Sequence, residues 1–177
     1  MPVVSGAEFL KAARKGGYAV GGYNTNNLEW TQAILEAAEA KKAPVLIQTS
    51  MGAAKYMGGY KVAKDMITNL VDSMNITVPV AIHLDHGDYE AALECIEVGY
   101  TSIMFDGSHL PFEENLKLAK DVVEKAHAKG ISVECEVGSI GGEEDGIIGT
   151  GELADIEECK QMVATGIDYL ACGIGNI

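Results

Sequence analysis

The sequence predicts a parallel α/β fold, and two observations carry this prediction. Segments with strand character alternate with segments of helical character along the chain, which is typical of strands joined by crossover helices. Polar residues also stand at or near the carboxyl ends of successive predicted strands. An open sheet gathers ligand-binding groups at one switch point, whereas a barrel gathers them around one mouth. The pattern therefore favours a TIM (β/α)8 barrel, of which this chain supplies about the first six strands.

The predicted strands are short apolar runs, as expected for parallel strands covered by helices. They cover residues 18–23, 44–49, 77–84, 102–105, 131–137 and 169–173. The polar residues at or near their ends are Asn24, Ser50, Asp85, His86, Asp106, Glu134 and Glu136. No GxGxxG follows the first strand and no Walker pattern occurs, which weakens a nucleotide-binding alternative.

The predicted helices show helical spacing of apolar residues and end at glycines or polar turns. They cover residues 6–15, 28–42, 60–74, 89–98, 112–129 and 156–165, and a Gly- and Glu-rich loop is predicted over residues 138–151. We expect residues 1–177 to form a single, incomplete TIM-barrel domain. A barrel needs eight strands, and the sequence stops directly after a predicted strand. We therefore expect either that a further segment completes the barrel or that the sheet is open with an exposed edge.

The composition argues against some classes of partner. The 177 residues include 26 Asp and Glu against 13 Lys and Arg, a formal net charge of −13. There is no cationic surplus to bind nucleic acid or an acidic membrane. No apolar run approaches the length of a membrane span, and no signal-peptide pattern is present. The four cysteines form no CxxC pair, which fits a reducing compartment and predicts a cytoplasmic location.

The segment from Val80 to Gly87 is the first candidate for chemistry, because a buried strand here ends in a carboxylate beside an imidazole. The two-residue period of a strand places His83 and Asp85 on one face, with His86 opposite or at the strand end. One interpretation is a hydrogen-bonded core histidine and an aspartate that caps the next helix. The other is a functional site, and the segment alone leaves both open.

A metal site is the first functional hypothesis. His86, Asp106, Glu134 and Glu136, with His83 and His109 as further candidates, could converge at one mouth. An imidazole with carboxylates suits Zn²⁺ or a similar divalent cation. For His83 we favour a core residue hydrogen-bonded to a neighbouring strand, and for His109 a residue at a helix entrance.

Acid–base chemistry is the second functional hypothesis. Asp85, beside a candidate metal ligand, is placed to move a proton on a bound substrate. Glu144 lies in an acidic segment flanked by glycines, which could be a mobile lid or a solvated surface loop, and the residues alone favour the latter. No lysine stands at a predicted strand end, which argues against a covalent lysine mechanism.

Together these residues resemble the class II, zinc-dependent fructose-bisphosphate aldolases, in particular those of Gram-positive bacteria. The resemblance covers essentially the whole chain. It is carried by residues 18–27, 44–50, 78–87, 104–109, 132–138, 141–146 and 173–177. Tagatose-bisphosphate aldolases share these motifs, so the choice between the two substrates stays open, as does a catalytically inactive truncated barrel.

The resemblance implies a role for individual residues. His86 matches a ligand of the catalytic zinc, and Asp106 and Glu136 match ligands of a second or alternate metal position. Asp85 matches the proton donor, and Glu144 matches a loop carboxylate that exchanges protons on dihydroxyacetone phosphate. Asn24 and Ser50 match substrate contacts.

The resemblance also implies a reaction and an assembly. The reaction is the reversible cleavage of fructose 1,6-bisphosphate to dihydroxyacetone phosphate and glyceraldehyde 3-phosphate in glycolysis and gluconeogenesis, through a zinc-stabilised enediolate. The implied assembly is a homodimer or homotetramer. The family's next zinc-ligand histidine would follow directly after Ile177, and its phosphate loop and a distal arginine would come later. We therefore expect residues 1–177 alone to be inactive and to bind zinc weakly.

Overall fold

The computed structural model describes residues 2–139, 141–144, 147–149 and 151–175. Its centre is a six-stranded sheet in the order β1-β2-β3-β4-β5-β8, in which every neighbouring pair is parallel. The strands are β1 Gly21–Asn24, β2 Val45–Ser50, β3 Val80–Gly87, β4 Ser102–Phe105, β5 Ser132–Val137 and β8 Tyr169–Cys172. Their spatial order follows the chain without a reversal, as in a singly wound barrel and unlike a doubly wound sheet.

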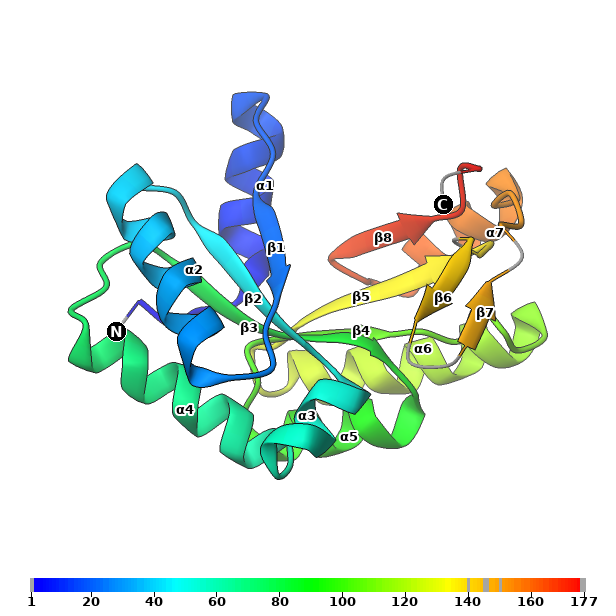
Figure 1. The fold of residues 1–177 in the computed structure, drawn as a ribbon. Coiled ribbons are helices and arrows are strands. Elements are labelled where there is room, and N and C mark those ends of the chain that lie inside the picture. The colour runs from blue at the N-terminus through cyan, green and yellow to red at the C-terminus, as the bar shows by residue number, and fades with distance from the viewer. Residues whose placement is uncertain (1, 140, 145–146, 150, 176–177) are drawn as a thin grey trace.

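The sheet is strongly curved, and helices run along its convex side, except for the first helix, which lies on the concave side, where Phe9 packs against Leu46 and Ala81 (Figure 1). The helices are α1 Gly6–Gly16, α2 Leu28–Lys41, α3 Met51–Met57, α4 Tyr60–Ser73, α5 Tyr89–Val98, α6 Phe112–His127 and α7 Ile156–Val163. This is the predicted partial (β/α)8 barrel, with six strands. Within the described residues, no helix is both long enough and apolar enough to cross a membrane.

The main core lies between the sheet and the outer helices. Alternate strand residues such as Ile82, Leu84 and Ile103 are fully buried there, together with Ile67 of α4 and Val122 of α6. The strand period then turns the residues between them, His83 and Asp85 among them, toward the concave side. The outer packing therefore determines which side chains face the barrel interior.

Two elements were not predicted. Helix α3 follows β2 directly, and the Ser50 side chain caps it by accepting a hydrogen bond from the Ala53 amide at 3.2 Å. Strands β6 Gly142–Glu144 and β7 Ile147–Gly149 form an antiparallel hairpin where the sequence predicts only a loop. Both elements are too short to show a clear hydrophobic period.

Hydrogen bonds of Glu39 link the end of α2 to the segment before β3. Its carboxylate pairs with Lys42 and accepts hydrogen bonds from the Thr77 amide at 2.7 Å, the Thr77 hydroxyl at 2.8 Å and the Val78 amide at 3.2 Å. The hydrogen bond from Lys42 and those from Thr77 lower the pKa of Glu39 from 4.5 to about 2.

A Glu39→Gln variant is expected to be less stable than the wild type at neutral pH. A carboxyl whose pKa is lowered by folding stabilises the protein above its ordinary pKa, and this contribution is lost as the pH falls toward the folded-state value. The difference in urea stability should therefore be constant above about pH 5 and shrink toward pH 2. Glu36→Gln, on the exposed side of the same helix, is the control. A stability difference that does not depend on pH would contradict the explanation.

Candidate active site

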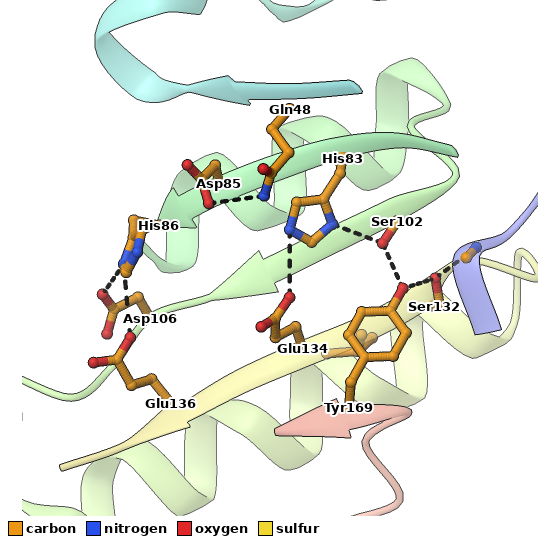
Figure 2. Close-up of polar contacts among 12 residues, drawn as sticks. Gln48, His83, Asp85, His86, Ser102, Asp106, Ser132, Glu134, Glu136 and Tyr169 are labelled. Atoms are coloured by element: carbon orange, nitrogen blue, oxygen red, sulfur yellow. Dashed lines mark hydrogen bonds and ion pairs between the residues drawn. The ribbon is translucent and has the colours of Figure 1, made fainter. Parts of the chain in front are cut away.

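A local irregularity in β3 sets the direction of His86. The pairing of β3 with β4 shifts between Leu84 and Gly87, so that one extra residue is accommodated on β3. His86 takes the left-handed conformation, with φ of 47°, which non-glycine residues rarely adopt. A bulge of this kind re-aims a side chain. Strict alternation would put His86 opposite Asp85, whereas the bulge turns it toward Asp106 and Glu136 (Figure 2).

Gly87 closes the bulge because there is no space for a larger residue. A Cβ atom at this position would lie 2.2 Å from Cδ2 of Leu84 and 3.1 Å from the carbonyl oxygen of Met104. Leu84 belongs to the outer core, so it has little freedom to move away. The His86-Gly87 pair is therefore needed as a unit to give this backbone path.

Three side chains from neighbouring strands meet at the mouth. The ring of His86 lies with Nδ1 2.7 Å from Oδ2 of Asp106, in a hydrogen bond, and 3.7 Å from Oε2 of Glu136 (Figure 2). The three residues come from β3, from the segment after β4 and from β5, and their potential ligand atoms all lie within 4.8 Å of one another. Glu136 is only 2% exposed.

The surroundings of Asp106 keep it ionised. Burial opposes the charge, but hydrogen bonds from His86 and from Ser108 outweigh it and lower the pKa of Asp106. The amide of Ser108 donates to Oδ1 of Asp106 at 3.0 Å. One imidazole nitrogen and two carboxylates, one of them deeply buried, form a donor set that suits Zn²⁺ or a similar divalent cation. The residues present therefore fit the metal that the sequence predicts.

Asp85 is oriented by two side-chain amides. Nδ2 of Asn24 donates to one carboxylate oxygen at 2.7 Å, and Nε2 of Gln48 donates to the other at 3.2 Å. Asn24 lies at the end of β1 and Gln48 in β2, so two further strands position this group. Sequence reasoning missed Gln48. Its signal was a polar side chain in an apolar strand, two residues before Ser50 and hence on the same face.

The other predicted site residues differ in how the structure places them. Ser50 pairs in register with Asp85, and its hydroxyl serves as the cap of α3. The backbone of Glu144 belongs to β6, but its side chain lies outside the described part of the molecule. His109 is exposed. Among the described residues, the group that could hold a metal includes neither His83, His109 nor Glu134.

His83 and Glu134 form a deeper polar layer below the metal group. His83 is fully buried, and its Nδ1 lies 2.7 Å from Oγ of Ser102 on β4, as expected for a core histidine bonded to a neighbouring strand. Burial lowers the pKa of His83 to about 4 although the Asp85 charge opposes this shift. Burial, assisted by the charge of Asp85, raises the pKa of Glu134 to about 7.

The fold and the site together define an α/β-barrel protein with a candidate metal site and an oriented carboxylate at one mouth. The family model described as "Fructose-bisphosphate aldolase class-II" matches residues 4–177, and the chain belongs to this family. This confirms the resemblance found in the sequence.

Curated relatives and a solved structure agree with this assignment. The chain is 82% identical over 177 residues to a fructose-bisphosphate aldolase of Streptococcus pneumoniae and 54% identical over 180 residues to one of Geobacillus stearothermophilus. It spans 60% and 63% of the lengths of these relatives. The YdjI aldolase of Escherichia coli K12 superimposes with a TM-score of 0.84 at 30% identity, covering 98% of this chain and 63% of that one.

Proposed function

We propose that this chain carries the metal-binding and proton-transfer groups of a class II aldolase that reversibly cleaves fructose 1,6-bisphosphate to dihydroxyacetone phosphate and glyceraldehyde 3-phosphate. One observation supports this most directly: Asp85, oriented by two amides, is followed in the sequence by His86, which the bulge turns toward two carboxylates. A proton-transfer group and a cation site would then act on the same small substrate.

We assign His86 to the catalytic cation position and Asp106 and Glu136 to a second or alternate position. A divalent cation such as Zn²⁺ would act there as a Lewis acid toward the ketose carbonyl. The negative charge of Asp106 and Glu136 favours a cation at the mouth over an uncompensated cluster of acids. The hydrogen bond from the Ser108 amide holds Asp106 in place, as outer contacts of metal ligands generally do.

We assign Asp85 to the proton transfer. In condensation it would give a proton to the aldehyde oxygen, and in cleavage it would take the proton from the corresponding hydroxyl. The amides of Asn24 and Gln48 fix the carboxylate plane, so little reorganisation is needed at the moment of transfer. Glu144 is proposed for proton exchange on dihydroxyacetone phosphate, and Asn24 and Ser50 for substrate contacts.

The remaining proposals concern the whole protein. We propose a homodimer or homotetramer, a cytoplasmic location and a role in glycolysis and gluconeogenesis, and we treat residues 1–177 as one incomplete barrel domain. The curated relatives are longer than this chain. We propose that the six strands of residues 1–177 do not enclose the site by themselves, which would weaken the electrostatic interactions that a closed site uses.

Cleavage of fructose 1,6-bisphosphate by the full-length protein is expected to depend on Zn²⁺. Treatment with EDTA should abolish turnover and added Zn²⁺ should restore it, in an assay that couples triose phosphate release to NADH oxidation. Residues 1–177 alone should show no turnover in the same assay. Cleavage that resists EDTA would contradict the proposal, and a higher kcat/KM for tagatose 1,6-bisphosphate would assign the related substrate instead.

A further inference from the structure

Helix α6 carries one polar side chain on its buried face. Asn115, near the start of the helix, is only 2% exposed. The other buried residues of the helix are apolar: Leu116, Ala119, Val122, Val123 and Ala126. Burying an amide is costly unless it is hydrogen-bonded. A buried asparagine in this position therefore needs an explanation.

The side chain of Asn115 spans the ends of two neighbouring strands. Its Nδ2 donates to the backbone carbonyl of Glu136, on β5, at 3.1 Å. A carbonyl oxygen can only accept, so the NH₂ group must face Glu136 and Oδ1 must point the other way. On that side lies Gly107, just after β4, where a Cβ atom would be 2.5 Å from Oδ1. Asn115 thus contacts both of the segments that carry the carboxylates of Asp106 and Glu136.

The hydrogen bond lies where the pairing of β4 with β5 stops. The carbonyl of Val137 accepts from the residue after β8 at 3.0 Å, so alternation along β5 turns the carbonyl of Glu136 to the opposite side, toward β4. The last residue of β4 is Phe105, and in a longer strand the amide of Gly107 would donate to this carbonyl. The chain turns there instead, and Asn115 supplies a donor from the helix layer.

This arrangement matters for the candidate metal group because two of its members stand on the two segments. Asp106 directly precedes Gly107, and Glu136 is the residue whose carbonyl accepts from Asn115. The two carboxylates lie next to each other beside His86 (Figure 2). Contacts that hold metal ligands in place typically change metal affinity by about 10- to 100-fold.

We propose that Asn115 is a positioning residue of the candidate metal group. Its NH₂ group holds the backbone of Glu136, and its Oδ1 limits how closely the turn at Gly107 can approach. The spacing of the Asp106 and Glu136 carboxylates is thereby set before a cation binds. The effect on metal binding rests on the proposed function. The link between the two strand ends does not, because it is made by the chain itself.

An Asn115→Leu variant of the full-length protein tests the proposal. Leucine has nearly the size and shape of asparagine but no hydrogen-bond donor, so the space stays filled while the Glu136 carbonyl loses this partner. We expect the affinity for Zn²⁺, measured by competition with a chelator, to fall by about 10-fold. The visible absorption spectrum of the Co²⁺-substituted protein, which reports the geometry of the ligands, should change as well. Asn115→Ala, which also removes the contact with Gly107, should act in the same direction.

Hydrogen–deuterium exchange of the metal-free protein tests the link itself. Peptides that cover residues 105–110 and 134–138 should exchange faster in Asn115→Leu than in the wild type, because the two strand ends open more easily. Val122→Ala is the matched control, since this fully buried residue lies two turns further along the same helix, outside the site. It should lose stability through the cavity it leaves, but keep the zinc affinity, the Co²⁺ spectrum and the exchange of both segments.

The outcomes separate this proposal from the proposed function. Wild-type zinc affinity and an unchanged Co²⁺ spectrum in both Asn115 variants would overturn the positioning role, as would effects equal to those of Val122→Ala. If the wild type bound no Zn²⁺, the proposed function would fail. Faster exchange confined to the two segments in Asn115→Leu would still support the positioning role in that case.

Discussion

Replacing Asp85 with asparagine is expected to lower kcat for cleavage of fructose 1,6-bisphosphate by about 10²- to 10⁴-fold, the usual contribution of a general acid–base group. The substitution keeps the size of the side chain but removes its capacity to take up and release a proton. It also puts an NH₂ group where the two oxygens of Asp85 accept from Asn24 and Gln48. Some loss of orientation is therefore expected in addition.

The measurement is a steady-state assay of the full-length protein, with zinc content determined on the same samples. Zinc content should match the wild type, because Asp85 is not a member of the candidate metal group. Asp65→Asn, on the outer helix α4, is the control for a change of Asp to Asn and should keep full activity. An active Asp85→Asn variant would remove this residue from the proton transfer.

Replacing His86 with alanine is expected to weaken zinc binding by at least about 100-fold, because changes to the partners of metal ligands alone cost about 10- to 100-fold. The substitution also removes the hydrogen bond to Asp106, which leaves two carboxylates near each other without their imidazole. Repulsion between them should raise the pKa of one of them.

Competition with a chromogenic chelator measures the zinc affinity of the full-length variant. His109→Ala is the control, since this exposed histidine lies near the same mouth, follows Asp106 by three residues and is not part of the metal group. It should bind zinc like the wild type. Equal affinities for His86→Ala and His109→Ala would show that the cation lies elsewhere.

Most of the fold could be predicted from the sequence because each element is marked by local signals. The strand 102–105 and the helix 89–98 were predicted with the bounds that the structure has. Gly99 ends the helix, and Asp106 and Gly107 follow directly after the strand. Strand β1 begins three residues later than predicted, because the segment after Gly17 leaves α1 without pairing to β2. The hairpin β6–β7 was missed because its three-residue strands are too short to show a period.

The candidate site could be predicted only in part. Strand ends gave the positions of Asp85, His86, Asp106 and Glu136, because parallel strands bring their carboxyl ends to one side. The contacts between them depend on register, and a slip of one residue turns a side chain to the other face. Hence neither the direction of His86 nor the amide of Gln48 on Asp85 could be obtained from periodicity.

The bulge in β3 interrupts the alternation of side chains between the two faces of the strand, so that Asp85 and His86 both face the concave side. In a regular strand, two side chains on one face are at least two residues apart, about 6.6 Å along the strand. Here the proposed proton carrier and the proposed metal ligand are consecutive, so their Cα atoms are separated by one peptide unit, about 3.8 Å. Covalent geometry, rather than packing, therefore limits how far the two groups can drift apart. An insertion of one residue directly before Asp85 or directly after His86 would leave the two residues adjacent and would instead change the face of the sheet toward which they point.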